Sequence, residues 1–138
     1  MKITSEQEMI KFGEEFATSL LKPNSPSVIE LIGDVGAGKT TFVRGLAKGL
    51  GIKEPITSPS FTISKSYALP NNRYLVHYDF YRLGDPGLMV ENFYENISNS
   101  NNIVLIEWGE SVKNLLPDNH IAITINYNDD NTRKVKIK

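Results

Sequence analysis

A glycine-rich turn follows a short apolar run at residues 28–32 and has the pattern Gly33-x-x-x-x-Gly38-Lys39-Thr40. This is the phosphate-binding, or Walker A, pattern, which requires a strand before the turn and a helix after it. The preceding VIELI is typical of a buried parallel strand. After the turn, apolar residues recur at helical spacing over 42–50, and Gly51 stands where a left-handed cap would end the helix. The chain therefore has the strand, loop and helix of an α/β phosphate-binding fold.

The chemistry of a polyphosphate explains the residue types in this turn. Backbone amides converge on one anion only if the loop wraps tightly, which glycine permits. The helix that begins near Lys39 directs the positive end of its dipole at the same anion. Lys39 brings a charge to the β- and γ-phosphates, and the Thr40 hydroxyl is placed to ligate Mg²⁺. We predict that the nucleotide-binding residues are Gly33, Gly36, Ala37, Gly38, Lys39, Thr40 and Thr41.

Hydrolysis also needs a carboxylate for the metal and a group that orients water. The segment from Arg73 is typical of a strand that carries Asp79 near its end, and the apolar run 103–106 leads to Glu107. An acidic residue at the end of an apolar strand is the Walker B arrangement, because the ends of neighbouring parallel strands meet beside the phosphate loop. The alternatives are a turn or capping role for Asp79 and a surface position for Glu107. We predict that Lys39, Asp79 and Glu107 are the catalytic residues.

Other residues have more ordinary interpretations. His77 is expected to be packed or hydrogen-bonded rather than a ligand, and Trp108 is expected to pack rather than to stack on a base. The alternating aromatic residues of 74–81 are expected in the core. Arg82 has two open interpretations, as a residue that contacts phosphate or as a salt-bridge partner of Asp85.

The two ends of the chain have recognisable local patterns. Ser5 and Glu8 have the spacing of a capping box, in which each side chain bonds the backbone amide of the other at a helix start. Apolar residues then recur at helical spacing from Met9 to Leu20. Near the other end, apolar residues alternate over 121–127 and again at 135–137, with NDDN between them. This pattern predicts a terminal antiparallel hairpin.

Composition limits the classes of protein that fit. The 138 residues suffice for one domain, and we expect a single domain over 1–138. The chain has no cysteine, which excludes disulfides and a thiol nucleophile. Lys+Arg is 15 and Asp+Glu is 16, so no overall charge attracts nucleic acid or an anionic membrane. The polar N-terminus and the lack of a long apolar run lead us to expect a cytoplasmic protein that contacts no membrane.

Four segments together resemble a known family. GDVGAGKTTF, SPSFTI, HYDFYRLGDP and IEWGE occur in the order and spacing of the TsaE proteins, formerly called YjeE, which are small bacterial ATPases. The resemblance covers nearly the whole chain. It implies a P-loop fold with a mixed, mostly parallel central sheet flanked by helices and with a C-terminal antiparallel hairpin.

The resemblance also implies roles for particular residues. It places Mg²⁺-ATP on residues 36–41, with the metal held by Thr40 and Glu107, and gives Asp79 a role in hydrolysis. It makes 57–62 a switch-like loop over the γ-phosphate. It places Glu6 and Arg133 beside the base.

For function, the resemblance implies an ATPase required for the threonylcarbamoyladenosine modification of tRNAs that decode ANN codons. Its partners would be the TsaB and TsaD proteins, with tRNA reached only through that complex. Two alternatives remain: a nucleotide-gated adaptor with little turnover, and a small-molecule kinase. The arginines are scattered and form no lid segment, which disfavours a kinase. Since no N/T-K-x-D guanine-reading motif is present, we expect adenine to be preferred over guanine.

Overall fold

The computed structural model describes residues 1–34, 36–57, 64–80, 87 and 89–138. Three α-helices lie in these ranges: α1 (Glu6–Leu20), α2 (Lys39–Leu50) and α3 (Met89–Ser98). Two short 3₁₀ helices are η1 (Pro70–Asn72) and η2 (Gly109–Leu115). The strands are β1 (Lys2–Ile3), β2 (Val28–Ile32), β3 (Ser64–Leu69), β4 (Arg73–Asp79), β5 (Asn102–Glu107), β6 (Ile121–Tyr127) and β7 (Arg133–Ile137).

The strands form one mixed sheet in the order β1-β7-β6-β2-β5-β4-β3. Its four central strands, β6, β2, β5 and β4, pair in parallel. Antiparallel pairing adds β3 at one edge and β7 followed by β1 at the other. Because the central strands are parallel, their carboxyl ends lie at one edge of the sheet, which is where an α/β fold places a ligand.

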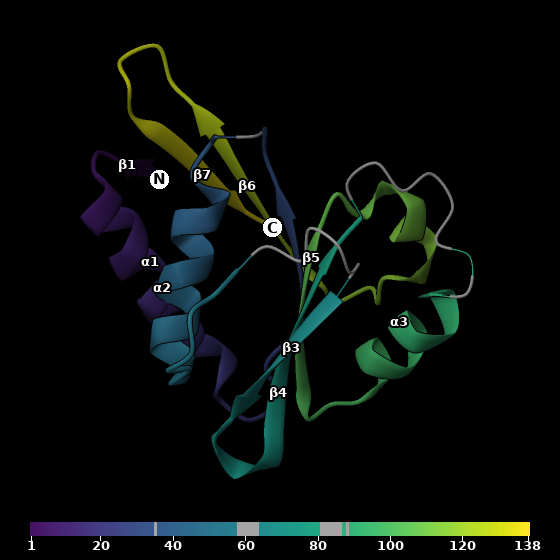
Figure 1. The fold of residues 1–138 in the computed structure, drawn as a ribbon. Coiled ribbons are helices and arrows are strands. Elements are labelled where there is room, and N and C mark those ends of the chain that lie inside the picture. The colour runs from purple at the N-terminus through teal and green to yellow at the C-terminus, as the bar shows by residue number, and fades with distance from the viewer. Residues whose placement is uncertain (35, 58–63, 81–86, 88) are drawn as a thin grey trace.

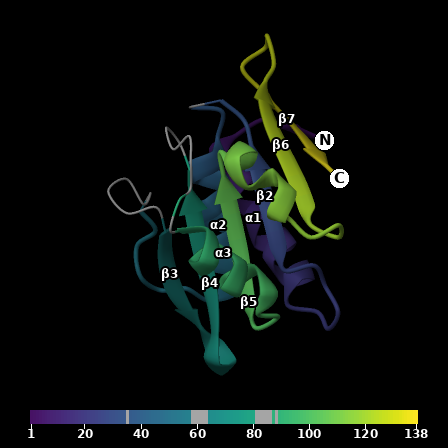
Figure 2. The same cartoon turned by 90° about the vertical axis from the view of Figure 1, so that its right-hand side faces the viewer.

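Helices cover both faces of this sheet. Figures 1 and 2 show α1 and α2 side by side against one face, with α3 on the other face. The α1/α2 side contains the larger apolar core, which includes Phe42, Leu46 and Leu105. The α3 side has a smaller cluster in which Tyr78, Phe80 and Phe93 pack ring against ring. The sheet is therefore buried on both faces at its centre, as its apolar strand β5 requires.

The two helices of the larger core approach each other closely. A Cβ atom at Gly45 of α2 would clash with the carbonyl oxygen of Ile10 in α1. Glycine at this position therefore sets the distance between the helices. The close packing holds α2, which begins at the end of the phosphate loop, against α1.

The predicted fold class is confirmed. The strand, loop and helix occur where predicted, with α2 from Lys39 to Leu50 and the left-handed Gly51 as its cap. Strand β4 ends at Asp79 and β5 ends at Glu107. The terminal hairpin is β6 and β7. No described residues form a helix long and apolar enough to cross a membrane.

Two local predictions need correction. The Ser5 hydroxyl accepts the Glu8 N–H at 3.1 Å, and Ser5 is the N-cap of α1, as predicted. The reciprocal bond differs, because the Glu8 carboxylate accepts from the Thr4 N–H at 2.8 Å and the Thr4 hydroxyl at 2.7 Å rather than from the Ser5 N–H. Thr4 offers two donors where Ser5 would offer only its backbone. Tyr74 was expected in the core but is 48% exposed, because it lies at the beginning of β4.

Candidate functional site

The phosphate loop joins β2 to α2. Gly36 and Gly38 have φ values of 83° and 110°, conformations that favour glycine. Gly38 is the N-cap of α2, and it has no side chain with which to satisfy the first N–H groups of the helix. These amides, together with the helix dipole, make the start of α2 suited to an anion.

A pocket of about 340 Å³ lies at this loop and is called here the phosphate-side pocket. The predicted catalytic residues Lys39, Asp79 and Glu107 line it together. The complete lining consists of Gly36, Gly38, Lys39, Thr40, Thr41, Val43, Ile56, His77, Asp79, Glu107 and Trp108. The topology explains this grouping: Asp79 and Glu107 are register partners on β4 and β5, and Glu107 in turn pairs with Leu31 of β2, just before the phosphate loop.

Lys39 is buried, with 7% of its surface exposed. Its Nζ lies 3.7 Å from Oε1 of Glu107 and 4.4 Å from the centre of the Trp108 ring. A buried ammonium needs such partners, since removing it from water is costly. Trp108 packs in the smaller core as expected, but it also forms a wall of the pocket.

Glu107 is held from its other side by His77. The His77 Nε2 lies 2.7 Å from Oε2 of Glu107, and the histidine is 3% exposed. Its Nδ1 is buried without a hydrogen-bond partner among the described residues. A proton on Nε2 therefore suits this position best, with the imidazole donating to the carboxylate. The predicted hydrogen-bonded role of His77 is confirmed, and the bond fixes the orientation of Glu107.

A second pocket, of about 230 Å³, lies on the other side of the phosphate loop and is called here the hairpin-side pocket. Glu6 and Arg133, which the family resemblance placed beside the base, both line it. Its full lining is Ile3, Thr4, Ser5, Glu6, Met9, Gly36, Gly38, Thr41, Asn131 and Arg133. Because Gly36, Gly38 and Thr41 belong to both pockets, an elongated ligand could extend from one into the other.

The terminal hairpin forms hydrogen bonds to two backbone carbonyls of the phosphate loop. The Arg133 Nε donates to the Ala37 carbonyl at 3.0 Å, and the Tyr127 hydroxyl donates to the Gly36 carbonyl. The Arg133 guanidinium carbon lies 3.7 Å from the centre of the Tyr127 ring. Tyr127 and Asn131 were not predicted as site residues; their only signal was their place in the predicted hairpin.

Two of the predicted loop residues have roles in packing and loop closure. Gly33 lies outside both pockets, and a Cβ there would be 2.4 Å from the Ile125 carbonyl oxygen, so the close approach of β6 requires glycine. Ala37 is 1% exposed and its N–H donates to the Asp34 carbonyl at 3.0 Å. This bond closes the loop.

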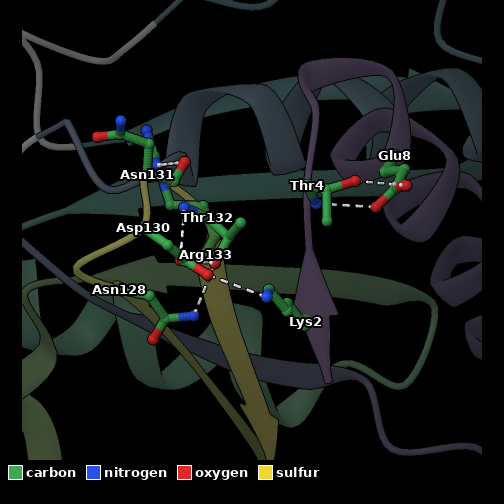
Figure 3. Close-up of polar contacts among 8 residues, drawn as sticks. All are labelled: Lys2, Thr4, Glu8, Asn128, Asp130, Asn131, Thr132 and Arg133. Carbon is green, nitrogen blue, oxygen red and sulfur yellow. Dashed lines mark hydrogen bonds and ion pairs between the residues drawn. The ribbon is translucent and has the colours of Figure 1, made fainter.

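The hairpin turn and the N-terminus meet at the rim of the hairpin-side pocket. Figure 3 shows Lys2 pointing at Asp130, with an ion pair of 3.0 Å. Asp130 also accepts from the Thr132 hydroxyl at 2.5 Å and the Thr132 N–H at 3.3 Å. The Thr132 hydroxyl, then Lys2, hold the pKa of Asp130 at about 2. The Thr4 N–H and hydroxyl likewise lower the pKa of Glu8, which Figure 3 shows beside them.

The residues present fit a magnesium nucleotide. Thr40 and Glu107 offer hydroxyl and carboxylate oxygens at the same pocket, and Mg²⁺ typically uses one or two such ligands together with phosphate oxygens and waters. Of the predicted switch-like loop 57–62, only Thr57 lies within the described residues. Its N–H donates to the Tyr67 hydroxyl and its carbonyl accepts from it, both at 3.2 Å. Arg82 and Asp85 lie outside the described residues.

Comparison with known proteins identifies the family. A profile described as "Threonylcarbamoyl adenosine biosynthesis protein TsaE" matches residues 3–135. The chain belongs to the TsaE family. The predicted family membership is thereby confirmed, over nearly the whole chain.

Several TsaE relatives support this. The tRNA threonylcarbamoyladenosine biosynthesis protein TsaE of Haemophilus influenzae is 38% identical over 130 residues, which cover 93% of this chain and 82% of the relative. The TsaE protein of Nostoc sp. is 43% identical over 117 residues, covering 80% of this chain and 69% of the relative. The crystal structure of Bacillus subtilis YdiB superposes with a TM-score of 0.73 at 30% identity, covering 99% of this chain and 82% of that one.

Proposed function

We propose that this chain is a Mg²⁺-dependent ATPase that acts in the threonylcarbamoyladenosine modification of tRNAs that decode ANN codons. The observation that carries the proposal is the buried pair of Lys39 and Glu107 in the phosphate-side pocket, where Asp79 and the phosphate loop also lie. A lysine and a carboxylate held together at the N-terminus of a helix suit a phosphoryl group and its metal. The relatives that match the chain carry this pathway in their names.

In the proposed reaction, each group at the site has a separate role. Amides of the loop and of the first turn of α2 bind the phosphates, and Lys39 neutralises charge on the β- and γ-phosphoryl oxygens. Thr40 and Glu107 would hold the metal, which lowers the cost of the charge that develops during phosphoryl transfer. Asp79, one strand from Glu107, orients the attacking water. His77 keeps Glu107 turned toward the pocket.

The base would lie in the hairpin-side pocket, between Glu6 and Arg133. We propose ATP rather than GTP as the substrate, on the absence of a guanine-reading motif in the sequence. The partners we propose are TsaB and TsaD in the cytoplasm, with tRNA contacted only through that complex. The formal net charge of −1 supports weak binding of tRNA by the isolated chain.

Phosphate release from Mg²⁺-ATP, measured with and without purified TsaB and TsaD, tests the proposal. We expect release that requires Mg²⁺ and increases in the complex. Nucleotide binding with no release under either condition would favour the adaptor alternative. A phosphorylated small-molecule acceptor would favour a kinase. In a parallel calorimetric titration, GDP binding tighter than ADP binding would contradict the proposed base preference.

A further inference from the structure

We propose that Tyr127 and Arg133 are positioning residues that orient the peptide groups of the phosphate loop from the terminal hairpin. This inference rests on the proposed function, because it concerns the same nucleotide site. It assigns a role to Tyr127, and it gives Arg133 a role other than contact with the base. The two residues are called here the hairpin clamp.

The clamp arises from strand register. Tyr127 is the last residue of β6 and Arg133 the first of β7, and they are direct register partners. Paired residues of an antiparallel ladder place their side chains on the same face, close enough to interact. The guanidinium therefore stacks on the tyrosine ring, with 3.7 Å between its central carbon and the ring centre. Each side chain supports the other while both reach the loop.

The two clamp bonds fall on consecutive carbonyls of the loop. Tyr127 donates to the carbonyl of Gly36, and Arg133 donates to the carbonyl of Ala37. Gly36 and Gly38, which flank Ala37, both have positive φ, and glycine is the residue type with the widest range of backbone conformations. Hydrogen bonds from outside the loop therefore restrict peptide groups that the glycines alone would leave variable.

Because the peptide group is planar, a hydrogen bond to its carbonyl also fixes the direction of the N–H in the same group. In a trans peptide, the carbonyl of one residue and the N–H of the next point in opposite directions. The Tyr127 bond thus directs the Ala37 N–H away from the hairpin, toward the Asp34 carbonyl that it meets at 3.0 Å. In the same way, the Arg133 bond directs the Gly38 N–H away from the hairpin. Orienting these groups in advance is what a phosphate loop needs, since ordering them during binding would reduce affinity.

Arg133 lines the pocket proposed for the base, and its other contacts show that it also connects the hairpin to the loop. Its NH1 donates to the Asn131 carbonyl at 3.2 Å, so the guanidinium joins the hairpin turn to the loop. One face of the guanidinium lies over the tyrosine ring. Two guanidinium nitrogens of Arg133 therefore donate hydrogen bonds to backbone carbonyls, and one face of the guanidinium packs on Tyr127.

Calorimetric titration with inorganic pyrophosphate and with ADP, both with Mg²⁺, separates the two roles. Tyr127→Phe removes only the hydroxyl, and Arg133→Lys keeps the charge but loses the planar fork. The matched control is Tyr94→Phe, because Tyr94 is 58% exposed on α3 and Tyr127 is 54% exposed. We expect Tyr127→Phe and Arg133→Lys each to weaken both ligands by the same factor, about 2- to 10-fold, the range for one hydrogen bond. The control should bind as wild type.

Amide exchange in the ligand-free protein tests the clamp independently of nucleotide. Tyr127→Phe should increase the exchange rate of the Ala37 N–H by a similar factor of about 2 to 10 while leaving the exchange of β5 amides unchanged. Unchanged exchange at Ala37, or wild-type affinity for both ligands in Tyr127→Phe, would overturn the clamp. A loss in Arg133→Lys confined to ADP would instead make Arg133 a base contact. If the wild-type protein bound neither ligand, the proposed function would fail, and Ala37 exchange would still decide the clamp.

Discussion

The phosphate-side pocket and the hairpin-side pocket differ in how far their charged side chains are exposed to water. In the phosphate-side pocket the side chains of the Lys39–Glu107 pair are only 8% and 12% exposed. At the hairpin-side pocket the ion pairs are open to water, with Glu6 and Arg44 59% and 50% exposed. A buried charge that loses its partner is left uncompensated, which is costly, whereas an exposed pair contributes little. Substitutions of charged residues should therefore have larger effects in the phosphate-side pocket than at the hairpin-side pocket.

The largest effect is expected from Lys39→Ala, at the centre of the buried network. The change removes the charge that we propose to lie nearest the transferring phosphoryl group, and it leaves Glu107 without the Lys39 ammonium. ATP turnover should fall at least about 100-fold, the size expected for loss of one preorganised electrostatic partner. Phosphate release measures this, with Lys48→Ala as the control because Lys48 lies on the same helix and forms an exposed pair with Glu14. Near-normal turnover in Lys39→Ala would refute the active-site assignment.

The next largest effects should distinguish the two carboxylates of the same pocket. Glu107 is held by Lys39 and by His77, and a fixed oxygen suits a metal ligand. Asp79 ends its strand, where an acid suits the orientation of water. Glu107→Ala should weaken Mg²⁺-dependent nucleotide binding as well as turnover. Asp79→Asn should keep binding nearly intact and lose turnover.

Affinity for an ATP analogue over a series of Mg²⁺ concentrations, paired with phosphate release, tests this division. A shift in the Mg²⁺ dependence of Asp79→Asn, with none in Glu107→Ala, would reverse the roles. If the two variants behave alike, both acids share the metal.

A smaller effect is expected one contact further out, at His77. His77→Leu removes the donor to Glu107, whereas His77→Gln can retain an N–H near the same place. Since partners of metal ligands typically change metal affinity by 10–100-fold, His77→Leu should raise the Mg²⁺ concentration needed for nucleotide binding by about 10-fold. His77→Gln should restore most of it. Nucleotide binding without Mg²⁺ is the control, and equal Mg²⁺ dependence in all three proteins would show that His77 only packs.

The comparison also explains what the sequence could predict. The phosphate-side pocket follows from local patterns: a loop motif marks the end of β2, and apolar runs mark the ends of β4 and β5. Parallel pairing then brings Asp79 and Glu107 to the same edge without further information. The sequence predicted that His77 is packed or hydrogen-bonded, but it did not identify Glu107 as the partner. That pairing depends on side-chain rotamers on neighbouring strands.

The hairpin-side pocket depends on contacts that no local pattern encodes. Its walls come from the N-terminal segment and from the hairpin, which meet through the pairing of β1 with β7. The two-residue β1 is too short for a sequence signal, and the pairing of Tyr127 with Arg133 depends on the register across a five-residue connection. Only family resemblance placed Glu6 and Arg133 there.

Strand β3 and helix α3, which lie outside the two pockets, were also not predicted. The alternation in β3 is weak because this edge strand buries only Tyr67 and Leu69. Helix α3 had a usable signal, since Val90, Phe93, Tyr94 and Ile97 have helical spacing. That pattern is short and follows a glycine- and proline-containing stretch. Such a context favours a loop.

The smallest effect should come from the exposed rim of the hairpin-side pocket and should depend on pH. The Thr132 hydroxyl and Lys2 lower the pKa of Asp130 from 3.8 to about 2 in the folded protein. Because the folded pKa is depressed, the ionised carboxylate stabilises the fold above the unfolded pKa, and this contribution is lost as the pH falls through about 4 to 2. Asp130→Asn should therefore be less stable than wild type at pH 5, and the difference should shrink toward pH 2. Urea unfolding midpoints measure it, with Asp129→Asn as the control from the same turn. A difference in urea midpoint that stays constant or grows as the pH falls would show that these contacts do not hold the Asp130 carboxylate. The comparison of buried with exposed charges would then depend only on the effects measured in the phosphate-side pocket.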